Sequence, residues 1–104
     1  MPTDDLGDGA RTRFLVEAAS RPALARHVRL RFDAARNRSI LLAPERVLSL
    51  SDTAVAVLKL CDGSRSVEAI AAALAEDYDA APADILGDIL PVLQDLADKG
   101  YLRP

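Results

Sequence analysis

Apolar residues alternate with polar ones from position 28 to position 33, and this period of two predicts a short, half-buried strand, which two further short apolar segments follow before residue 51. In the first strand Val28, Leu30 and Phe32 fall on one side, whereas the residues between them are basic or polar. Turn residues separate the three segments, which are residues 28–33, 39–43 and 46–50. We therefore expect an antiparallel sheet of three strands with one buried face and one wet, basic face.

Beyond residue 50 the apolar period lengthens to that of a helix. Ser51 and Ser66 are suitable N-caps for two helices, and Pro82 fits the first turn of a third. The expected helices are residues 52–61, 67–78 and 82–99. This order predicts an α+β, winged-helix-like fold, in which a three-stranded antiparallel sheet is followed by a three-helix bundle.

The third predicted helix has a wider apolar face than a small sheet requires. Its apolar residues span an arc of roughly 160°, whereas packing on one side needs about 100°. The strand at residues 46–50 has no later strand to cover its free edge. An open edge beside surplus apolar helix surface would accept an extended peptide by strand addition. The alternatives are that the N-terminal arm, or a second copy of the chain by swapping, fills this groove.

Residues 1–20 show little apolar periodicity, and we expect a mobile N-terminal arm before one domain at residues 21–104. The net charge of −3 hides an uneven distribution. Residues 11–46 hold nine arginines against three acidic residues, a local charge of +6, whereas residues 47–104 hold four basic residues against ten acidic ones, −6. No apolar run approaches the roughly 20 residues that span a bilayer, and we expect a cytoplasmic protein without a membrane partner.

Residues that carry enzyme chemistry are scarce. Cys61 is the only cysteine and His27 the only histidine, which excludes an intrachain disulfide and a cysteine-rich metal site. We expect Cys61 to be a buried, inert thiol and His27 a surface imidazole. The carboxylate pairs on the third helix are interpreted as solvated surface: Asp84/Asp88 and Asp95/Asp98. No phosphate-binding or nucleophile motif is present, so we expect no enzyme, no metal and no cofactor.

A winged-helix outline also raises nucleic-acid binding. The third helix would then enter the major groove, but it carries four aspartates against Lys99 alone and would repel phosphates. We therefore expect no nucleic-acid partner. A nucleic-acid-binding winged helix and a structural module that dimerises remain the two rival hypotheses.

Four short motifs carry a family resemblance that extends from Arg21 to Leu102. They are Val-Arg-Leu-Arg-Phe-Asp at 28–33, Leu-Leu-Ala-Pro-Glu-Arg-Val at 41–47, Leu-Lys-Leu-Cys-Asp-Gly at 58–63 with Val-Glu-Ala-Ile at 67–70, and Gly-Tyr-Leu at 100–102. On these residues the chain resembles the pyrroloquinoline quinone biosynthesis protein D family. The resemblance implies a peptide chaperone, the founding example of the recognition element used in making ribosomal peptide products.

The resemblance also implies partners and a site. Such a chain would bind the quinone precursor peptide and present it to a radical S-adenosylmethionine enzyme, which cross-links a glutamate and a tyrosine and carries the iron–sulfur clusters itself. In recognition elements of this kind the leader peptide pairs with the third strand and rests on the third helix. The matching residues here are Arg46, Val47, Leu48, Ser49 and Leu50 on the strand, and Ile85, Ile89 and Leu93 on the helix.

We therefore expect a non-covalent mechanism that combines strand pairing, apolar anchors on the third helix and basic residues that steer an acidic partner. A proline at Leu48 is expected to remove a hydrogen bond to the peptide. We expect a monomer, with a swapped dimer as the alternative.

Overall fold

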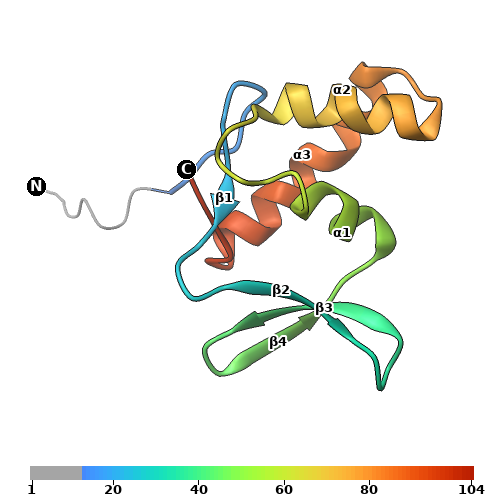
Figure 1. Cartoon of the computed structure of the whole chain (residues 1–104). Coiled ribbons are helices and arrows are strands. Elements are labelled where there is room, and N and C mark those ends of the chain that lie inside the picture. The colour runs from blue at the N-terminus through green and yellow to red at the C-terminus, as the bar shows by residue number, and fades with distance from the viewer. Residues whose placement is uncertain (1–12) are drawn as a thin grey trace, which may run out of the picture.

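A three-stranded antiparallel sheet lies below three helices in the computed structural model, which describes residues 13–104 (Figure 1). The strands of this sheet are β2 (Arg29–Asp33), β3 (Arg38–Ala43) and β4 (Arg46–Ser49). The helices are α1 (Asp52–Leu58), α2 (Val67–Tyr78) and α3 (Pro82–Asp98). The predicted α+β order of three strands followed by three helices is confirmed.

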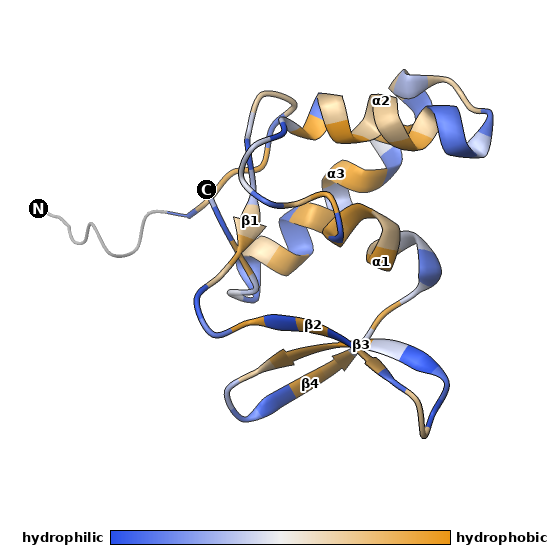
Figure 2. Cartoon of the chain, viewed as in Figure 1, coloured by the Kyte–Doolittle hydropathy of each residue, from blue (hydrophilic) through white to orange (hydrophobic). Residues whose placement is uncertain are grey.

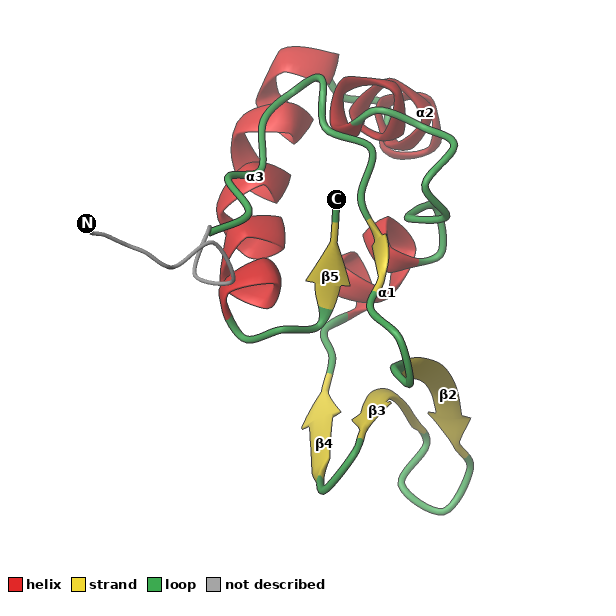
Figure 3. Cartoon of the chain, turned by 90° about the vertical axis from the view of Figure 1, so that its left-hand side faces the viewer, coloured by secondary structure: helices red, strands yellow, loops and turns green. Residues whose placement is uncertain are grey.

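A second β-pairing closes the chain near its ends. β1 (Ala23–Leu24) runs antiparallel to β5 (Leu102–Arg103), and the two lie side by side in Figure 3. Each strand has only two residues, too few for an alternating pattern to show in the sequence. The pairing fixes the C-terminus beside the segment that leads into the sheet.

The register of the sheet separates two faces. Leu30, Leu41 and Leu48 face one another across the strands and point toward the helices, where Leu41 is fully buried. Because successive side chains of a strand point to opposite faces, Arg29 and its cross-strand partners lie on the outer face. The predicted division into a buried and a basic face is therefore confirmed for Leu30 and Arg29 on β2, whereas the outer-face partners of Arg29 on β3 and β4 are the apolar Leu42 and Val47.

The predicted helix starts are confirmed by side-chain caps. The hydroxyl of Ser51 accepts from the Ala54 amide at 3.2 Å, and that of Ser66 accepts from the Ala69 amide at 3.1 Å. The first helix was expected to end at residue 61 but ends at Leu58. There the chain tightens into turns, in which the Cys61 amide donates to the Leu58 carbonyl.

The core lies between the three helices and the inner face of the sheet. Its largest fully buried side chains are Leu41, Ile70, Ile89, Leu93, Val57 and Val67. Two residues predicted on buried faces are exposed instead: Phe32 is 62% exposed and Tyr78 is 54% exposed. Phe32 pairs with Ser39 near the end of the β2–β3 hairpin, and Tyr78 is the last residue of α2. Both lie at the ends of their elements, where the core no longer covers them.

The N-terminal segment is part of the fold from residue 13 onward. The side-chain amide of Gln94 on α3 accepts from the Val16 amide and donates to the Phe14 carbonyl, each at 2.9 Å. Arg13 donates twice to the Asp98 carboxylate, both times at 2.7 Å. Residues 13–20 thus contact α3, the expectation of a mobile arm at residues 1–20 stays a prediction, and residues 1–12 lie outside the described part of the chain.

The same segment completes the start of α2. The carbonyls of Ala18 and Ser20 accept from the amides of Glu68 and Val67 at 3.0 and 2.9 Å. These amides belong to the first turn of the helix and have no partner inside it. Residues 13–20 thus bridge α2 and α3, and Phe14 and Val16 pack against the core beside α3. One flank of the wide apolar arc of α3 is covered in this way by the chain itself.

Candidate functional site

β4 forms an edge of the sheet. It pairs with β3 on one side, and within residues 13–104 no strand pairs with its other side. The Leu50 amide donates to the Ser39 carbonyl at 3.2 Å, which fixes the phase of the antiparallel ladder. In that phase the backbone of Leu48 faces β3, whereas the backbones of Val47 and Ser49 face away from it. The free edge therefore offers the N–H and C=O groups of Val47 and Ser49.

This geometry corrects the expected effect of a proline at Leu48. Because the Leu48 backbone pairs with Leu41 on β3, a proline there would break the sheet itself. The hydrogen bonds available to an added strand belong to Val47 and Ser49. The sequence pattern alone gives the strand but not the direction in which each amide points.

The helix residues predicted as apolar anchors differ in accessibility. Ile89 is 1% exposed and Leu93 is 0% exposed, so both are core residues rather than surface contacts. They lie at the centre of the apolar arc of α3, which faces the helices and the sheet. Ile85 lies at the edge of that arc and is only half-buried. Of the three, Ile85 is the one with a partly exposed side chain.

A cavity of about 200 Å³ opens next to Ile85, between α1, α2 and α3. Its lining is Thr53, Leu74, Tyr78, Ile85, Asp88 and Ile89. The volume is below that of pockets for drug-sized ligands and fits one large apolar side chain. The apolar periodicity of α3 was visible in the sequence, but its meeting with Tyr78, which was expected on a buried face, depends on how the helices cross.

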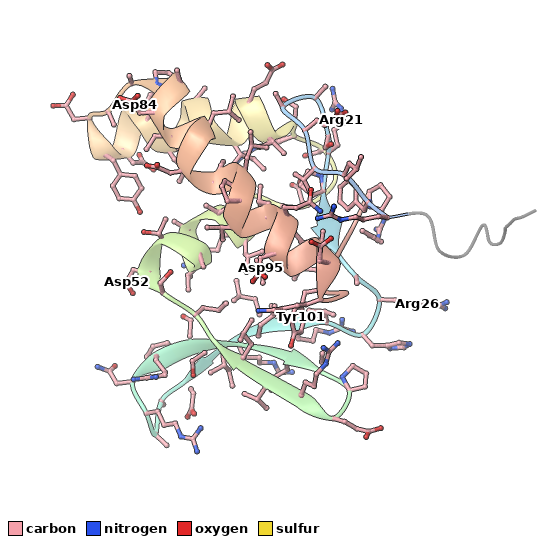
Figure 4. The ribbon with its side chains drawn as sticks, turned by 180° about the vertical axis from the view of Figure 1, so that it is seen from behind. Arg21, Arg26, Asp52, Asp84, Asp95 and Tyr101 are labelled. Atoms are coloured by element: carbon pink, nitrogen blue, oxygen red, sulfur yellow. The ribbon has the colours of Figure 1, made fainter. Side chains whose placement is uncertain are left out.

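Arg46 closes the other end of the region between β4 and α3. Its guanidinium donates to the Lys99 carbonyl at 3.1 Å and lies 4.8 Å from the centre of the Tyr101 ring. Figure 4 shows Tyr101 between the end of α3 and the sheet, with Asp95 nearby on the helix. Arg46, whose predicted peptide contact stays a prediction, ties the start of β4 to the end of α3. It sets the position of the free edge relative to the helix.

The exposed side of α3 is acidic. Asp84, Asp88 and Asp95 are exposed along it, and Lys99 is paired with Asp95 at 2.9 Å. A peptide that lies beside α3 therefore meets carboxylates, not the basic residues that were expected to steer it. The same carboxylates oppose the approach of phosphates, so the helix is poorly suited to a nucleic-acid groove.

Cys61 and His27 show no arrangement for catalysis. Cys61 is 4% exposed and its thiol donates to the Val57 carbonyl, and burial raises the pKa of the thiol to about 12. Such a thiol stays protonated and is a poor nucleophile at neutral pH. His27 is exposed in a turn, with φ of 68°.

No three of the described histidine, cysteine, aspartate or glutamate side chains gather as ligands for a metal ion. None of the described helices has the length and apolar character required to cross a bilayer.

The chain is similar to proteins of one family along most of its length. The family model described as coenzyme PQQ synthesis protein D (PqqD) matches residues 38–102. A PqqA binding protein of Rhodopseudomonas palustris (strain BisB5) is 59% identical over 87 residues, which cover 84% of this chain and 85% of that protein. A bifunctional coenzyme PQQ synthesis protein C/D of Methylorubrum extorquens (strain AM1) is 58% identical over 82 residues, 79% of this chain and 22% of its own length.

A solved structure has the same fold. The solution NMR structure of the PqqD truncation of Methylobacterium extorquens PqqCD, described as a functional, stand-alone RiPP recognition element, aligns with a TM-score of 0.76 at 53% identity. The alignment covers 86% of this chain and 95% of that one. On the family match, the identity to its relatives and the shared fold, the chain belongs to the coenzyme PQQ synthesis protein D (PqqD) family.

Proposed function

We propose that this protein binds the precursor peptide PqqA by strand addition at the free edge of β4 and performs no chemistry on it. The observation that carries the proposal is the outward backbone of Val47 and Ser49 on the edge strand β4. The relative named PqqA binding protein and the recognition element of M. extorquens support it, because both share this fold or sequence over most of the chain.

Main-chain hydrogen bonds and side-chain burial contribute separately to the binding free energy of an added strand. The four backbone groups of Val47 and Ser49 contribute about 1 kcal/mol each when paired, whatever the peptide sequence. Burying one large apolar side chain in the cavity beside Ile85 adds about 2 kcal/mol and depends on the sequence. The strand bonds thus fix the direction of the peptide, and the cavity selects its residues.

The lining of the cavity favours a particular peptide chemistry. Asp88 stands among apolar residues in that lining, and Asp84 is exposed nearby on the same helix. An apolar peptide residue next to a basic one would bury its side chain and pair its charge. A peptide with an acidic residue at that place would be repelled.

We also propose that the bound peptide is presented to a radical S-adenosylmethionine enzyme of the same pathway. The thiol of Cys61 is buried and protonated, so the chain offers no nucleophile of its own at this residue. The C/D relative of M. extorquens supports a domain that works beside others, because the matched region is 22% of its length.

Calorimetric titration with PqqA tests the proposal. Saturable one-to-one binding is expected, and a peptide of the same composition in scrambled order serves as the control. Equal affinity for the two peptides, or no binding of either by the folded protein, contradicts the proposed function.

A further inference from the structure

The outer face of the sheet is apolar at its centre and lacks a covering layer among the described residues. Ile40, Leu42 and Val47 point away from the helices, as their register with Arg31, Arg29 and Ser49 requires. None of the three packs against the core, and Val47 is 59% exposed. In Figure 2 β3 and β4 carry the colours of hydrophobic residues, while all helices lie on the other side.

Arginines border this apolar centre on β2. Arg29 faces Leu42 across the ladder, and Arg31 faces Ile40. Both arginines are exposed, and neither is paired with a carboxylate within residues 13–104. The outer face therefore combines aliphatic side chains with positive charges that no described carboxylate neutralises, although the Arg29 guanidinium also donates to the Val28 carbonyl at 3.2 Å.

A basic hollow adjoins the same edge of the sheet. It has a volume of about 840 Å³ and is lined by residues 24–30 and Arg103. Arg26, His27 and Arg29 lie in this lining, and Arg29 belongs to the outer face as well. The hollow thus extends the positive surface from β2 to the turn before it.

We propose that the outer face, defined as Arg29, Arg31, Ile40, Leu42 and Val47, is a second docking surface, which binds an apolar protein surface surrounded by carboxylates. We assign that surface to the enzyme that receives the peptide, and this step rests on the proposed function. The aliphatic centre favours a protein over a nucleic acid, because bases stack on aromatic side chains and this face has none. The charges complement an acidic partner and would speed its approach.

The size of the face indicates a weak complex. Strands about 4.8 Å apart with a rise of about 3.4 Å per residue give a flat footprint of about 250 Å² for this sheet. A stable interface buries about 800 Å² per partner, so the partner must also reach the basic hollow or the peptide. A peptide paired with β4 would widen the face by one strand, with alternate side chains beside Val47 and Ser49. The enzyme would then contact both the carrier and its cargo.

Charge reversal on the outer face tests the proposal with purified radical S-adenosylmethionine enzyme as the probe. Arg31→Glu is expected to weaken the affinity for the enzyme at least about tenfold, because it replaces an attraction with a repulsion. Arg65→Glu, the same charge change in the exposed loop before α2, is the matched control and should change it less than twofold. Leu42→Thr should also weaken the complex, about fivefold, without a change of charge.

The affinity for PqqA separates this proposal from the proposed function. Arg31→Glu and Leu42→Thr should bind the peptide as the wild type does, because β2 and β3 lie away from the free edge of β4. Unchanged enzyme affinity in Arg31→Glu and Leu42→Thr, with peptide binding intact, overturns the docking surface and leaves the proposed function standing. No peptide binding by the wild type overturns the proposed function instead, whatever the enzyme does.

Two other occupants would also overturn the assignment. A dimer in sedimentation over a dilution series that Leu42→Thr abolishes, with enzyme affinity unchanged, would make the face an interface between copies. RNA binding that Arg31→Glu removes, with enzyme affinity unchanged, would make it a nucleic-acid surface.

Discussion

Replacing Val47 with proline removes an edge hydrogen bond while leaving the sheet intact. The Val47 amide points away from β3, so its loss costs the β3–β4 ladder nothing. Its side chain is 59% exposed, and proline is tolerated at sheet edges, so the free energy of unfolding should change by no more than about 0.5 kcal/mol. The ladder position of the residue thus separates binding from folding.

The expected loss of PqqA affinity follows from one bond and one clash. A net hydrogen bond contributes about 1 kcal/mol, which is about fivefold in the dissociation constant. The proline ring also occupies the place of the incoming peptide carbonyl, which brings the expected loss to at least about tenfold. Calorimetry measures the affinity, and urea unfolding measures the stability. Val47→Ala keeps the amide and is the control for the side chain.

Leu48→Pro completes the comparison. Leu48 pairs with Leu41 inside the sheet and packs against the core, so this proline should destabilise the fold by about 3 kcal/mol or more. The reasoning is refuted if Val47→Pro binds PqqA as tightly as Val47→Ala does. It is equally refuted if Val47→Pro unfolds as readily as Leu48→Pro.

Three further predictions concern the helices and the N-terminal segment. Gly87→Ala should raise the free energy of unfolding by about 1 kcal/mol, because nothing lies within 4 Å of the added methyl group; no rise in the melting temperature would contradict this. Cys61 should not react with Ellman's reagent in the native protein at pH 8 and should react fully in denaturant, since its thiol is buried with a raised pKa; rapid native labelling would show that the site opens. The hydrogen bond from Arg13 lowers the pKa of Asp98, so this carboxylate stabilises the fold above its unfolded pKa of about 3.9 and loses that effect as the pH falls through the lower folded value. The stability difference between wild type and Asp98→Asn should therefore be constant above about pH 5 and shrink in acid, and a difference independent of pH would exclude the ion pair as its source.

The sequence predicts local structure here because two strong signals agree. Residues 28–33 alternate between apolar and polar, and the structure has a strand there. After residue 50 the apolar residues follow a helical period, Ser51 and Ser66 are suitable N-caps, and the structure has helices that start at these caps. Their order was sufficient for the fold class. The pairing of β1 with β5 was not predicted, because strands of two residues are too short to show an alternating pattern.

The site depends on relations that a single segment does not contain. Ile89 and Leu93 share the apolar arc of α3 with Ile85, and only the packing of the neighbouring helices decides which of them remains accessible. The outward backbone of Val47 depends on the register with β3. The resemblance implied a peptide site on β4 and α3, and the groups that this site would offer become visible only in the assembled sheet.

The N-terminal segment shows that a wide apolar face in a sequence does not reveal which segment covers it. The width of the arc on α3 predicted a missing neighbour but not its identity. Phe14 and Val16 supply part of it, held by the amide of Gln94. The free edge of β4 is left without a partner strand among the described residues.

Amide hydrogen exchange of β4 tests the central claim most directly. In the free protein the amide of Leu48 should be protected by the ladder, whereas those of Val47 and Ser49 should exchange rapidly. Saturating PqqA should slow the exchange of the Val47 and Ser49 amides. The scrambled peptide, added at the same concentration in place of PqqA, should leave both exchange rates unchanged. If PqqA binds and both amides continue to exchange at their free rates, the peptide does not add a strand to β4 and the account is wrong.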